Sequence, residues 1–450
     1  MLLVESMQYS LRHSGRHRQL SFEALAPREL LTVVDADYVI AISVDGLRSD
    51  AITSFNATEL PHFNRLRNEG AFTDNARTDH DVTLTLPNHT GMVTGRQALG
   101  VRGHGVVINV DSGGTVHESH GDYIDSVFDV VHDHGFSTGL YSGKDKFNLL
   151  ERSWNETNGA VDESGDDDGR DKIDRYVLEA DTSSLVDQFV ADMAASPFHF
   201  SLLHLRDPDA AGHGFGWLSP TYLDAVRHMD GLLGKVLDLV QNSATLAGKT
   251  VVLLTSDHGG IHGSHADNTD GNNYVIPFYA WGANVAQGDL YHFNPSTKAD
   301  PGLGRVDPGV SLQPIRNRDI ANLTLDILNL PPLPEGLNAA QDFEIGVLKP
   351  WQNLAAPVDV NNDGLATPFD VLLVINELNS KGIVEFEVPS PIQVATFYDV
   401  NGDNRLTPLD ALLGINYLNE HGSGPIFGGP PAASLEVEEA WLPEKTSAFR

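Results

Sequence analysis

Residues 249–265 read KTVVLLTSDHGGIHGSH, and this stretch indicates the fold class of the chain. Its residues 251–254 form an unbroken run of Val and Leu with polar flanks, which is typical of a strand buried on both faces. Asp257 and His258 follow it closely. Because ligands of open α/β sheets bind beyond the carboxyl ends of the strands, this pair is placed to hold a metal ion. The alternative is a capped strand end with a surface aspartate.

Further apolar runs predict the other strands, and amphipathic segments predict the helices between them. Strands are expected at residues 38–44, 103–109, 136–142, 198–205 and 275–281. Helices are expected at residues 61–68, 123–134, 184–195, 219–241 and 319–330. Strands that alternate with helices favour parallel pairing with right-handed crossovers. The sequence therefore predicts an α/β fold with a mostly parallel sheet that helices cover on both faces.

Reactive side chains follow several of these strands. Asp45 ends the first strand, and Asp209 and His213 follow the strand at residues 198–205, four positions apart, so that both can reach one ion. Thr85 lies just ahead of Pro87, a residue suited to opening a helix, and helix N-termini favour anions. Thr85 is therefore a candidate nucleophile for attack on phosphorus, with a simple capping role as the alternative.

Together the strand ends offer three carboxylates and three imidazoles but no thiol, because the chain lacks cysteine. The residues are Asp45, Asp209, His213, Asp257, His258 and His265. Oxygen and nitrogen ligands of this kind suit two zinc ions. Two such ions about 4 Å apart can hold the attacking and leaving oxygens of a phosphoryl displacement. The joint pattern favours an enzyme of phosphoryl transfer.

A different pattern begins after Trp351, where residues 359–370 recur 40 positions later as residues 399–410. Both segments match the twelve-residue calcium loop of a helix-loop-helix hand, and each runs into an apolar helix, at residues 371–378 and 411–418. Gly364 and Asn404 occupy position 6, which requires a left-handed turn. The sequence therefore predicts two calcium ions. Their expected ligands are Asp359, Asn361, Asp363, Leu365, Thr367 and Asp370, and Asp399, Asn401, Asp403, Arg405, Thr407 and Asp410.

The whole chain is strongly acidic, with 62 acidic and 29 basic residues and a formal net charge of −33. This charge argues against a surface that binds nucleic acid. No apolar run approaches the roughly 18 residues that a membrane span needs. Residues 22–31, FEALAPRELL, resemble the L-E-x-L-x-P-R-x-L-L signature of certain exported bacterial proteins, which implies an extracellular or cell-surface location.

From about residue 39 to residue 334, the chain resembles the alkaline phosphatase superfamily, and most of all its nucleotide pyrophosphatase/phosphodiesterase branch. The matching motifs are Asp-Gly-Leu-Arg at Asp45, Thr-Leu-Pro-Asn-His at Thr85, His-Gly-x-x-x-Asn ending at Asn109, Pro-Asp-x-x-Gly-His ending at His213, and Ser-Asp-His-Gly around Asp257. The resemblance implies an alkaline phosphatase-like α/β fold. It also implies a two-zinc phosphodiesterase or pyrophosphatase that forms a phosphothreonine intermediate.

The same resemblance implies a role for each site residue. One zinc ion would be held by Asp45, Thr85, Asp257 and His258, and the other by Asp209, His213 and a third histidine. His265 is the first candidate for this third position, and His262 is the reserve.

Asn109 would donate its amide hydrogens to a non-bridging phosphate oxygen. A neutral donor suits a monoanionic diester, whereas Lys or Arg would suit a dianion. Nearby cationic residues keep a phosphomonoesterase or phosphonate hydrolase open as the alternative; they are Arg48, Arg96, Lys144 and Lys146.

Residues 357–420 resemble a type I dockerin, which implies a cohesin-like protein partner. Asn404 and the long segment between the repeats, residues 380–398, depart from that pattern, so a purely structural calcium module is the alternative. A non-catalytic calcium-dependent scaffold or adhesion protein is the rival for the whole chain. The expected organisation is a leader at 1–35, a catalytic domain at 36–345, a linker at 346–356, the dockerin-like domain at 357–420 and a flexible tail at 421–450.

Overall fold

The computed structural model describes residues 34, 36–162, 169–295, 297–333, 343–346, 351–353, 356–386, 396–402 and 404–425. The export-like stretch at residues 22–31, much of the expected linker, Asp403 and the chain beyond residue 425 lie outside these ranges. Within the described ranges, no helix combines the length and apolar character that a membrane crossing requires.

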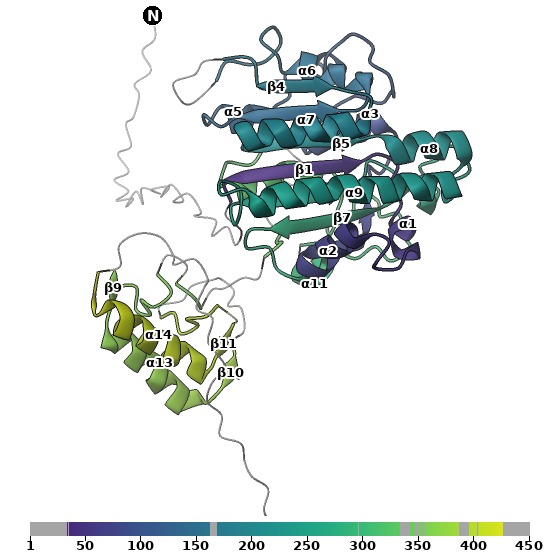
Figure 1. The fold of residues 1–450 in the computed structure, drawn as a ribbon. Helices are drawn as coiled ribbons and strands as arrows, with labels where there is room; N and C mark the ends of the chain where they lie inside the picture. Colours follow the sequence, from purple (N-terminus) through teal and green to yellow (C-terminus); the bar gives the residue numbers. More distant parts are fainter. Residues whose placement is uncertain are drawn as a thin grey trace, which may run out of the picture. The chain divides into compact units, whose positions relative to one another are not determined.

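An eight-stranded, mostly parallel sheet forms the centre of the larger part of the chain (Figure 1). Its strand order is β4-β3-β5-β1-β6-β7-β2-β8. All pairs from β4 to β6 are parallel, whereas β7 runs antiparallel to both of its neighbours. The strands are β1 Tyr38–Val44, β2 Ala71–Arg77, β3 Thr138–Ser142, β4 Arg175–Leu178, β5 Phe200–Leu205, β6 Thr250–Thr255, β7 Val275–Gly282 and β8 Gly288–Asp289. The prediction of a mostly parallel α/β sheet is confirmed.

Alternate residues of the central strand β1 pack into different cores. Val39 and Ala41 contribute to the core on one face of the sheet, whereas Ile40 and Ile42 contribute to the core on the other. A strand presents successive side chains to opposite faces, so a strand covered on both sides must be apolar throughout. This explains the uninterrupted apolar runs of β1 and β6 in the sequence.

Helices cover both faces of the sheet, and Figure 1 shows α7 and α9 side by side on one of them. That face carries α1 Ser49–Ser54, α2 Pro61–Glu69, α7 Thr182–Ala195 and α9 Pro220–Asn242. The opposite core contains residues of α3 Thr85–Thr94, α4 Val116–His120, α5 Val127–His132, α6 Asn148–Ser153, α11 Leu290–Phe293 and α12 Asp319–Ile327. The remaining helices of this part are η1 Asp145–Phe147, α8 Asp207–Phe215 and α10 Gly271–Tyr274.

Two predicted elements differ from the structure. The strand expected at residues 103–109 is wrong, because this segment is irregular: Gly105 has a φ of +76°, and a Cβ there would lie 2.2 Å from the carbonyl oxygen of Ser119. The helix expected at 123–134 is shorter, because a capping box between Ser126 and Asp129 starts α5 at Val127. Strands β2 and β4 were not expected from the sequence.

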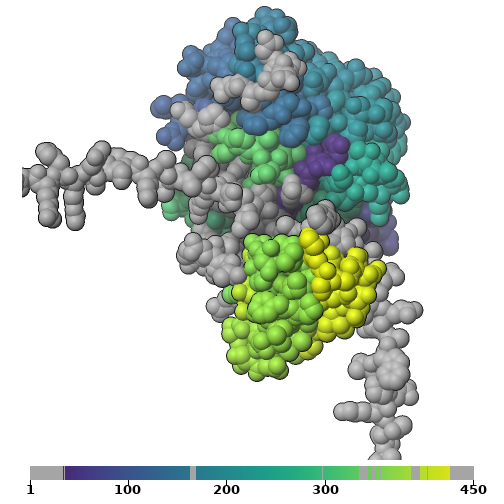
Figure 2. Space-filling model, turned by 90° about the vertical axis from the view of Figure 1, so that its left-hand side faces the viewer, coloured from purple at the N-terminus to yellow at the C-terminus, as the bar shows by residue number. Residues whose placement is uncertain are grey.

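Two helices and two short antiparallel strand pairs form the C-terminal module, defined here as the described residues from 351 to 425. The helices α13 Pro368–Lys381 and α14 Pro408–His421 pack against each other, and Figure 2 shows them as adjoining light-green and yellow surfaces. The strands are β9 Leu365–Ala366, β10 Val384–Glu385, β11 Arg405–Leu406 and β12 Gly424–Pro425. Because β12 pairs with β9, ordered structure continues past the expected boundary at residue 420.

A buried histidine beside α3 predicts a loss of stability in acid. Burial lowers the pKa of His104 to about 4, whereas the unfolded chain would titrate near 6.5. The unfolded state therefore binds the proton first as pH falls, and about 3 kcal/mol of unfolding free energy is lost between pH 6.5 and 4. Urea unfolding at pH 7 and at pH 4.5 measures this loss.

The variant His104→Asn is the matched control, since its amide oxygen can accept the hydrogen bond that Val106 N donates to His104 Nδ1. Its unfolding free energy should depend less on pH across this interval. An equal pH dependence in both proteins would show that His104 is not responsible.

Candidate active site

The carboxyl ends of three neighbouring strands bring the predicted aspartates together. Asp45 follows β1, Asp257 follows β6, and Asp209 lies in the first turn of α8, directly after β5. The three carboxylates are buried, as is Thr85, the first residue of α3. Because β5, β1 and β6 are parallel and adjacent, these residues meet at one edge of the sheet.

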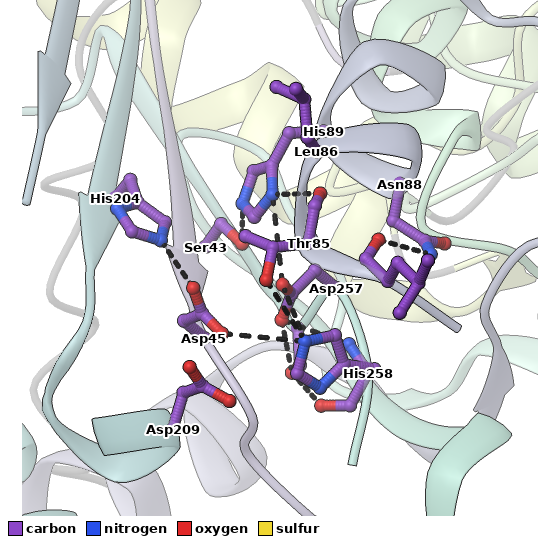
Figure 3. Close-up of polar contacts among 12 residues, drawn as sticks. Ser43, Asp45, Thr85, Leu86, Asn88, His89, His204, Asp209, Asp257 and His258 are labelled. Atoms are coloured by element: carbon purple, nitrogen blue, oxygen red, sulfur yellow. Dashed lines mark hydrogen bonds and ion pairs between the residues drawn. The ribbon is translucent and has the colours of Figure 1, made fainter. Parts of the chain in front are cut away.

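His258 is the centre of a first cluster, and Figure 3 shows Thr85, Asp45 and Asp257 around it. His258 Nε2 lies 3.2 Å from Asp257 Oδ2, 3.5 Å from Asp45 Oδ1 and 3.3 Å from Thr85 Oγ1. His258 Nδ1 contacts the carbonyl oxygen of Gly259 at 2.8 Å and donates to it, which leaves the lone pair on Nε2 facing the carboxylates. Two carboxylate oxygens, one imidazole nitrogen and the threonine hydroxyl therefore converge.

Asp209 is the centre of a second cluster. Its Oδ1 lies 3.4 Å from His213 Nε2 and 3.9 Å from His265 Nε2. Asp209 and His213 are four residues apart on α8, so both lie on one face of the helix. His213 Nδ1 donates to Gly263 O at 2.9 Å and His265 Nδ1 to Thr83 O at 2.6 Å, so both Nε2 lone pairs face Asp209.

The geometry separates the two candidate histidines of residues 249–265. His265 is buried, and its ring stacks on the ring of His258 with centroids 3.5 Å apart. His262 is exposed and has a φ of +58°. His265 therefore belongs to the cluster, and His262 lies outside it.

Metal ions fit these clusters, because the structure leaves buried oxygen atoms that a cation would satisfy. Asp45 Oδ1, Asp209 Oδ1 and Asp257 Oδ2 have no hydrogen-bond partner within the described ranges. Uncompensated buried carboxylates are costly. Two groups have ligand atoms close enough for one ion: Asp45, Asp257 and His258, and Asp209, His258 and His265. Carboxylate oxygens combined with imidazole nitrogens match the ligand preference of zinc.

The protonation states agree with this arrangement. Burial lowers the pKa of His258 to about 4 and that of His265 to about 3, so both imidazoles are neutral, as metal ligands must be. Burial and the neighbouring Asp45 carboxylate raise the pKa of Asp257 well above its usual range. A cation between the two carboxylates would remove this repulsion.

Lys144, which follows β3, joins the two clusters. Its Nζ lies 2.6 Å from Asp45 Oδ2 and 2.5 Å from Asp209 Oδ2, so each carboxylate keeps its other oxygen for its own cluster. Asp45 Oδ2 also accepts a hydrogen bond from His204 Nε2 at 2.8 Å. Burial alone would raise the pKa of Asp45, but Lys144 and His204 outweigh it and hold that pKa well below its usual range.

Asn109 lies beside the start of α3. Its Oδ1 accepts hydrogen bonds from Leu86 N at 2.9 Å and from Lys146 Nζ at 3.0 Å. The amide nitrogen of Asn109 is thereby oriented away from both donors. Arg48, considered above as a possible pocket cation, instead contacts Asp50 and the Gly260 carbonyl oxygen.

An indole ring fixes the distance between α8 and the loop after β6. Trp217 packs on Gly212 and Gly260: a Cβ would lie 2.5 Å from the ring at Gly212 and 2.0 Å from it at Gly260. Its Nε1 donates to Gly46 O at 2.9 Å. Gly46 has a φ of +70°, and a Cβ there would lie 2.9 Å from Asp209 Cα, so this turn also requires glycine.

Sequence reasoning missed the roles of His89 and His204, and it named Lys144 only as a possible pocket cation. His89 contacts the Thr85 carbonyl oxygen through Nδ1 and the Ser43 hydroxyl through Nε2, each at 2.8 Å. His204 and Lys144 orient the carboxylates as described above. A signal for His204 existed, because it is a polar residue in the otherwise apolar end of β5 and pairs with Ser43 in register.

The two predicted calcium loops have matching internal geometry. Asp359 accepts hydrogen bonds from Asp363 N and Gly364 N, and Asp399 accepts them from Gly402 N and Asn404 N. At the ends of the loops, Asp370 and Asp410 each bond the N–H and hydroxyl groups of the threonine three residues earlier. Gly364 and Asn404 have φ values of +82° and +58°, as position 6 requires. Asp403 lies outside the described residues.

Comparisons with known proteins agree with these two parts. The family model of type I phosphodiesterase / nucleotide pyrophosphatase matches residues 39–307, and that of the dockerin type I domain matches residues 357–424. The chain is 27% identical to human bis(5'-adenosyl)-triphosphatase over 240 residues, which covers 49% of this chain and 47% of that protein. It is 26% identical to murine ectonucleotide pyrophosphatase/phosphodiesterase family member 1 over 243 residues, which covers 50% of this chain and 24% of that protein.

The chain thus spans about half the length, or less, of these curated relatives. Among solved structures, murine ectonucleotide pyrophosphatase/phosphodiesterase 5 has a TM-score of 0.45 and 16% identity, covering 66% of this chain and 96% of that one. An alkaline phosphatase superfamily protein from Vibrio parahaemolyticus has a TM-score of 0.44 and 12% identity, covering 67% and 69% of the two chains.

Proposed function

Because the chain belongs to the type I phosphodiesterase / nucleotide pyrophosphatase family, we propose that it is a zinc-dependent hydrolase of phosphoric diester or pyrophosphate bonds with Thr85 as nucleophile. One observation carries the proposal: the Thr85 hydroxyl lies 3.3 Å from His258 Nε2, inside a cluster that includes unpartnered carboxylate oxygens. A threonine that only capped α3 would not need these neighbours. No side-chain cap hydrogen bond is present at this helix start.

Each residue of the site then has a defined task. Asp45, Asp257 and His258 would hold one zinc ion beside Thr85. Asp209, His265 and His213, whose Nε2 lies 3.4 Å from Asp209 Oδ1, would hold the other. Bound zinc supplies a lowered pKa for the attacking hydroxyl and compensates charge on the leaving oxygen. The chain itself positions Thr85 at the N-terminus of α3, where backbone N–H groups favour an anion.

The reaction proceeds in two displacements at phosphorus. In the first, Thr85 Oγ1 gives up its proton to water and forms a bond to phosphorus, and the ester or anhydride oxygen leaves and takes a proton from water. In the second, water attacks the phosphothreonine and releases Thr85. Asn109 donates its amide hydrogens to a non-bridging oxygen, since Leu86 N and Lys146 occupy its carbonyl oxygen.

The C-terminal module provides the second part of the proposal. Its two loops would bind one calcium ion each, through the ligands predicted from the sequence, and would order α13 and α14. The dockerin type I match supports a cohesin-like protein as partner. Together with the export-like stretch at residues 22–31, it supports an extracellular or cell-surface location.

Hydrolysis of bis(4-nitrophenyl) phosphate tests the enzymatic proposal. We expect nitrophenolate release by the zinc-loaded protein, loss of that release after metal removal, and recovery when zinc is added back. A zinc-loaded, folded protein that cleaves neither this diester nor a dinucleoside polyphosphate would contradict the proposal and favour a non-catalytic scaffold.

A variant in the second cluster is expected to lose one of the two proposed zinc ions and keep the other. Asp209→Asn removes one negative ligand from the cluster of His213 and His265, so bound zinc should fall from two ions per chain toward one. Turnover of the diester should fall by at least about a hundredfold, because the leaving oxygen loses its compensating charge. Elemental analysis and initial rates measure the two effects.

Asp207→Asn is the matched control on the same helix. Asp207 contacts Thr182 and His228 rather than the cluster. This variant should keep both zinc ions; if it loses zinc as Asp209→Asn does, the loss reflects damage to α8 instead of a missing ligand.

A further inference from the structure

Lys146 is a cation without an anionic partner at the edge of the site. Its Nζ donates to Asn109 Oδ1 at 3.0 Å, and within the described part of the chain it forms no ion pair. Lys144, two residues earlier, contacts two carboxylates. The two lysines therefore differ in role: Lys144 forms direct ion pairs with two carboxylates, whereas Lys146 interacts with the carboxylates of Asp45, Asp209 and Asp257 only at longer range.

The surroundings of Lys146 make this charge costly to keep. Burial and the Lys144 ammonium lower the pKa of Lys146, and the half-buried η1 segment holds its side chain beside Asn109. Asn109 could be oriented by Leu86 N alone, which already donates to the same oxygen. The additional ammonium group of Lys146 suits a ligand that carries more negative charge than the neutral Asn109 amide alone can bind.

We propose that Lys146 receives the second negative charge of a phosphoryl group, so that the protein also hydrolyses dianionic phosphate monoesters. This inference rests on the proposed function, since it uses the same nucleophile and the same metal centre. A diester phosphorus carries one ionised oxygen, which the Asn109 amide can serve. A monoester carries two, and Lys146 Nζ lies one hydrogen bond away from that amide.

The chemistry of the monoester follows the same two displacements. Thr85 Oγ1 gives up its proton to water and bonds to phosphorus, and the P–O ester bond breaks with its electron pair on the departing alcohol oxygen, which takes a proton from water. Water then attacks the phosphothreonine, the P–Oγ1 bond breaks, and inorganic phosphate leaves. Lys146 only provides a charged hydrogen bond to a non-bridging oxygen and transfers no proton.

The test compares 4-nitrophenyl phosphate with bis(4-nitrophenyl) phosphate. In Lys146→Met, the ratio of kcat/KM for the monoester to kcat/KM for the diester should fall at least about tenfold, the value of one hydrogen bond to a charged group. Inhibition of diester hydrolysis by inorganic phosphate should weaken by a similar factor. Lys146→Arg, which keeps the charge, should retain both properties.

Controls separate the possible failures. Lys235→Met removes an exposed lysine on α9 and should leave the substrate ratio unchanged, and zinc content should be equal in all variants. Equal losses for both substrates in Lys146→Met would overturn the inference and leave Lys146 as a support for Asn109. A wild-type protein that cleaves the diester but not the monoester would also overturn it. Cleavage of neither substrate would instead contradict the proposed function.

Discussion

Replacing Thr85 with alanine is expected to lower kcat/KM for diester hydrolysis by at least about a thousandfold while zinc binding and the fold are retained. In the proposed mechanism this hydroxyl is the nucleophile, whereas His258 and Asp45 would be engaged as zinc ligands. Alanine has a higher helix propensity than threonine, and only two small groups are removed, so α3 should remain folded. Initial rates, zinc content and the unfolding midpoint measure the three quantities.

Two further variants make this prediction specific. Thr85→Ser keeps a hydroxyl at the same place and should recover a measurable part of the activity. Thr94→Ala removes another buried hydroxyl of α3, one that donates to Thr90 O at 2.7 Å, and should leave the rate within a few-fold of wild type. Comparable losses in Thr85→Ala and Thr94→Ala would show that the helix, and not the hydroxyl, limits the rate.

Withholding calcium is expected to unfold the C-terminal module while the α/β core remains folded. The apolar core of the module contains only a few fully buried side chains, among them Val360, Val374 and Leu406, so packing contributes little stability. The carboxylates of Asp359 and Asp370 are buried, and a bound cation would offset the cost of burying their charge. Folding and calcium binding should therefore be one transition.

Hydrogen exchange resolves this prediction by region. Zinc-loaded protein freed of calcium is titrated with calcium, and exchange in α13 and α14 should slow by at least about a hundredfold while β1 and β6 stay equally protected. The variant Asp370→Asn should need more calcium to reach the same protection than Glu377→Gln, a change on the same helix whose carboxylate pairs with Lys381. Simultaneous loss of protection in module and core would contradict independent folding.

The buried strands could be located in the sequence because a strand that is covered on both faces is apolar at every central position. The runs of β1 and β6 are apolar at every central position, as strands covered on both faces must be. Strand β2 left no such trace, since its residues Asp74 and Asn75 interrupt the run at a bulge. The prediction of a strand at residues 103–109 was wrong for the opposite reason. The segment contains apolar valines and an isoleucine, but Val107 and Ile108 are exposed.

The candidate ligands were predictable because motifs place them directly after strands, and parallel strands end at one edge. The partners of those ligands were not, because a contact such as Lys144 with Asp45 and Asp209 depends on three segments that are distant in sequence. The choice between His262 and His265 likewise depends on the backbone: the left-handed turn at His262 directs the chain so that only His265 enters the cluster.

Lys144 determines in what order this protein can fold and acquire its metals. Its ammonium group contacts both Asp45 and Asp209 and offsets their repulsion without any ion, so the α/β core is expected to fold before the proposed zinc ions bind. In the C-terminal module, Asp370 and Asp410 are held by backbone and threonine groups of their own loops. The proposed zinc ions could therefore bind after the core has folded, whereas the module, with its small apolar core, is expected to fold together with calcium binding.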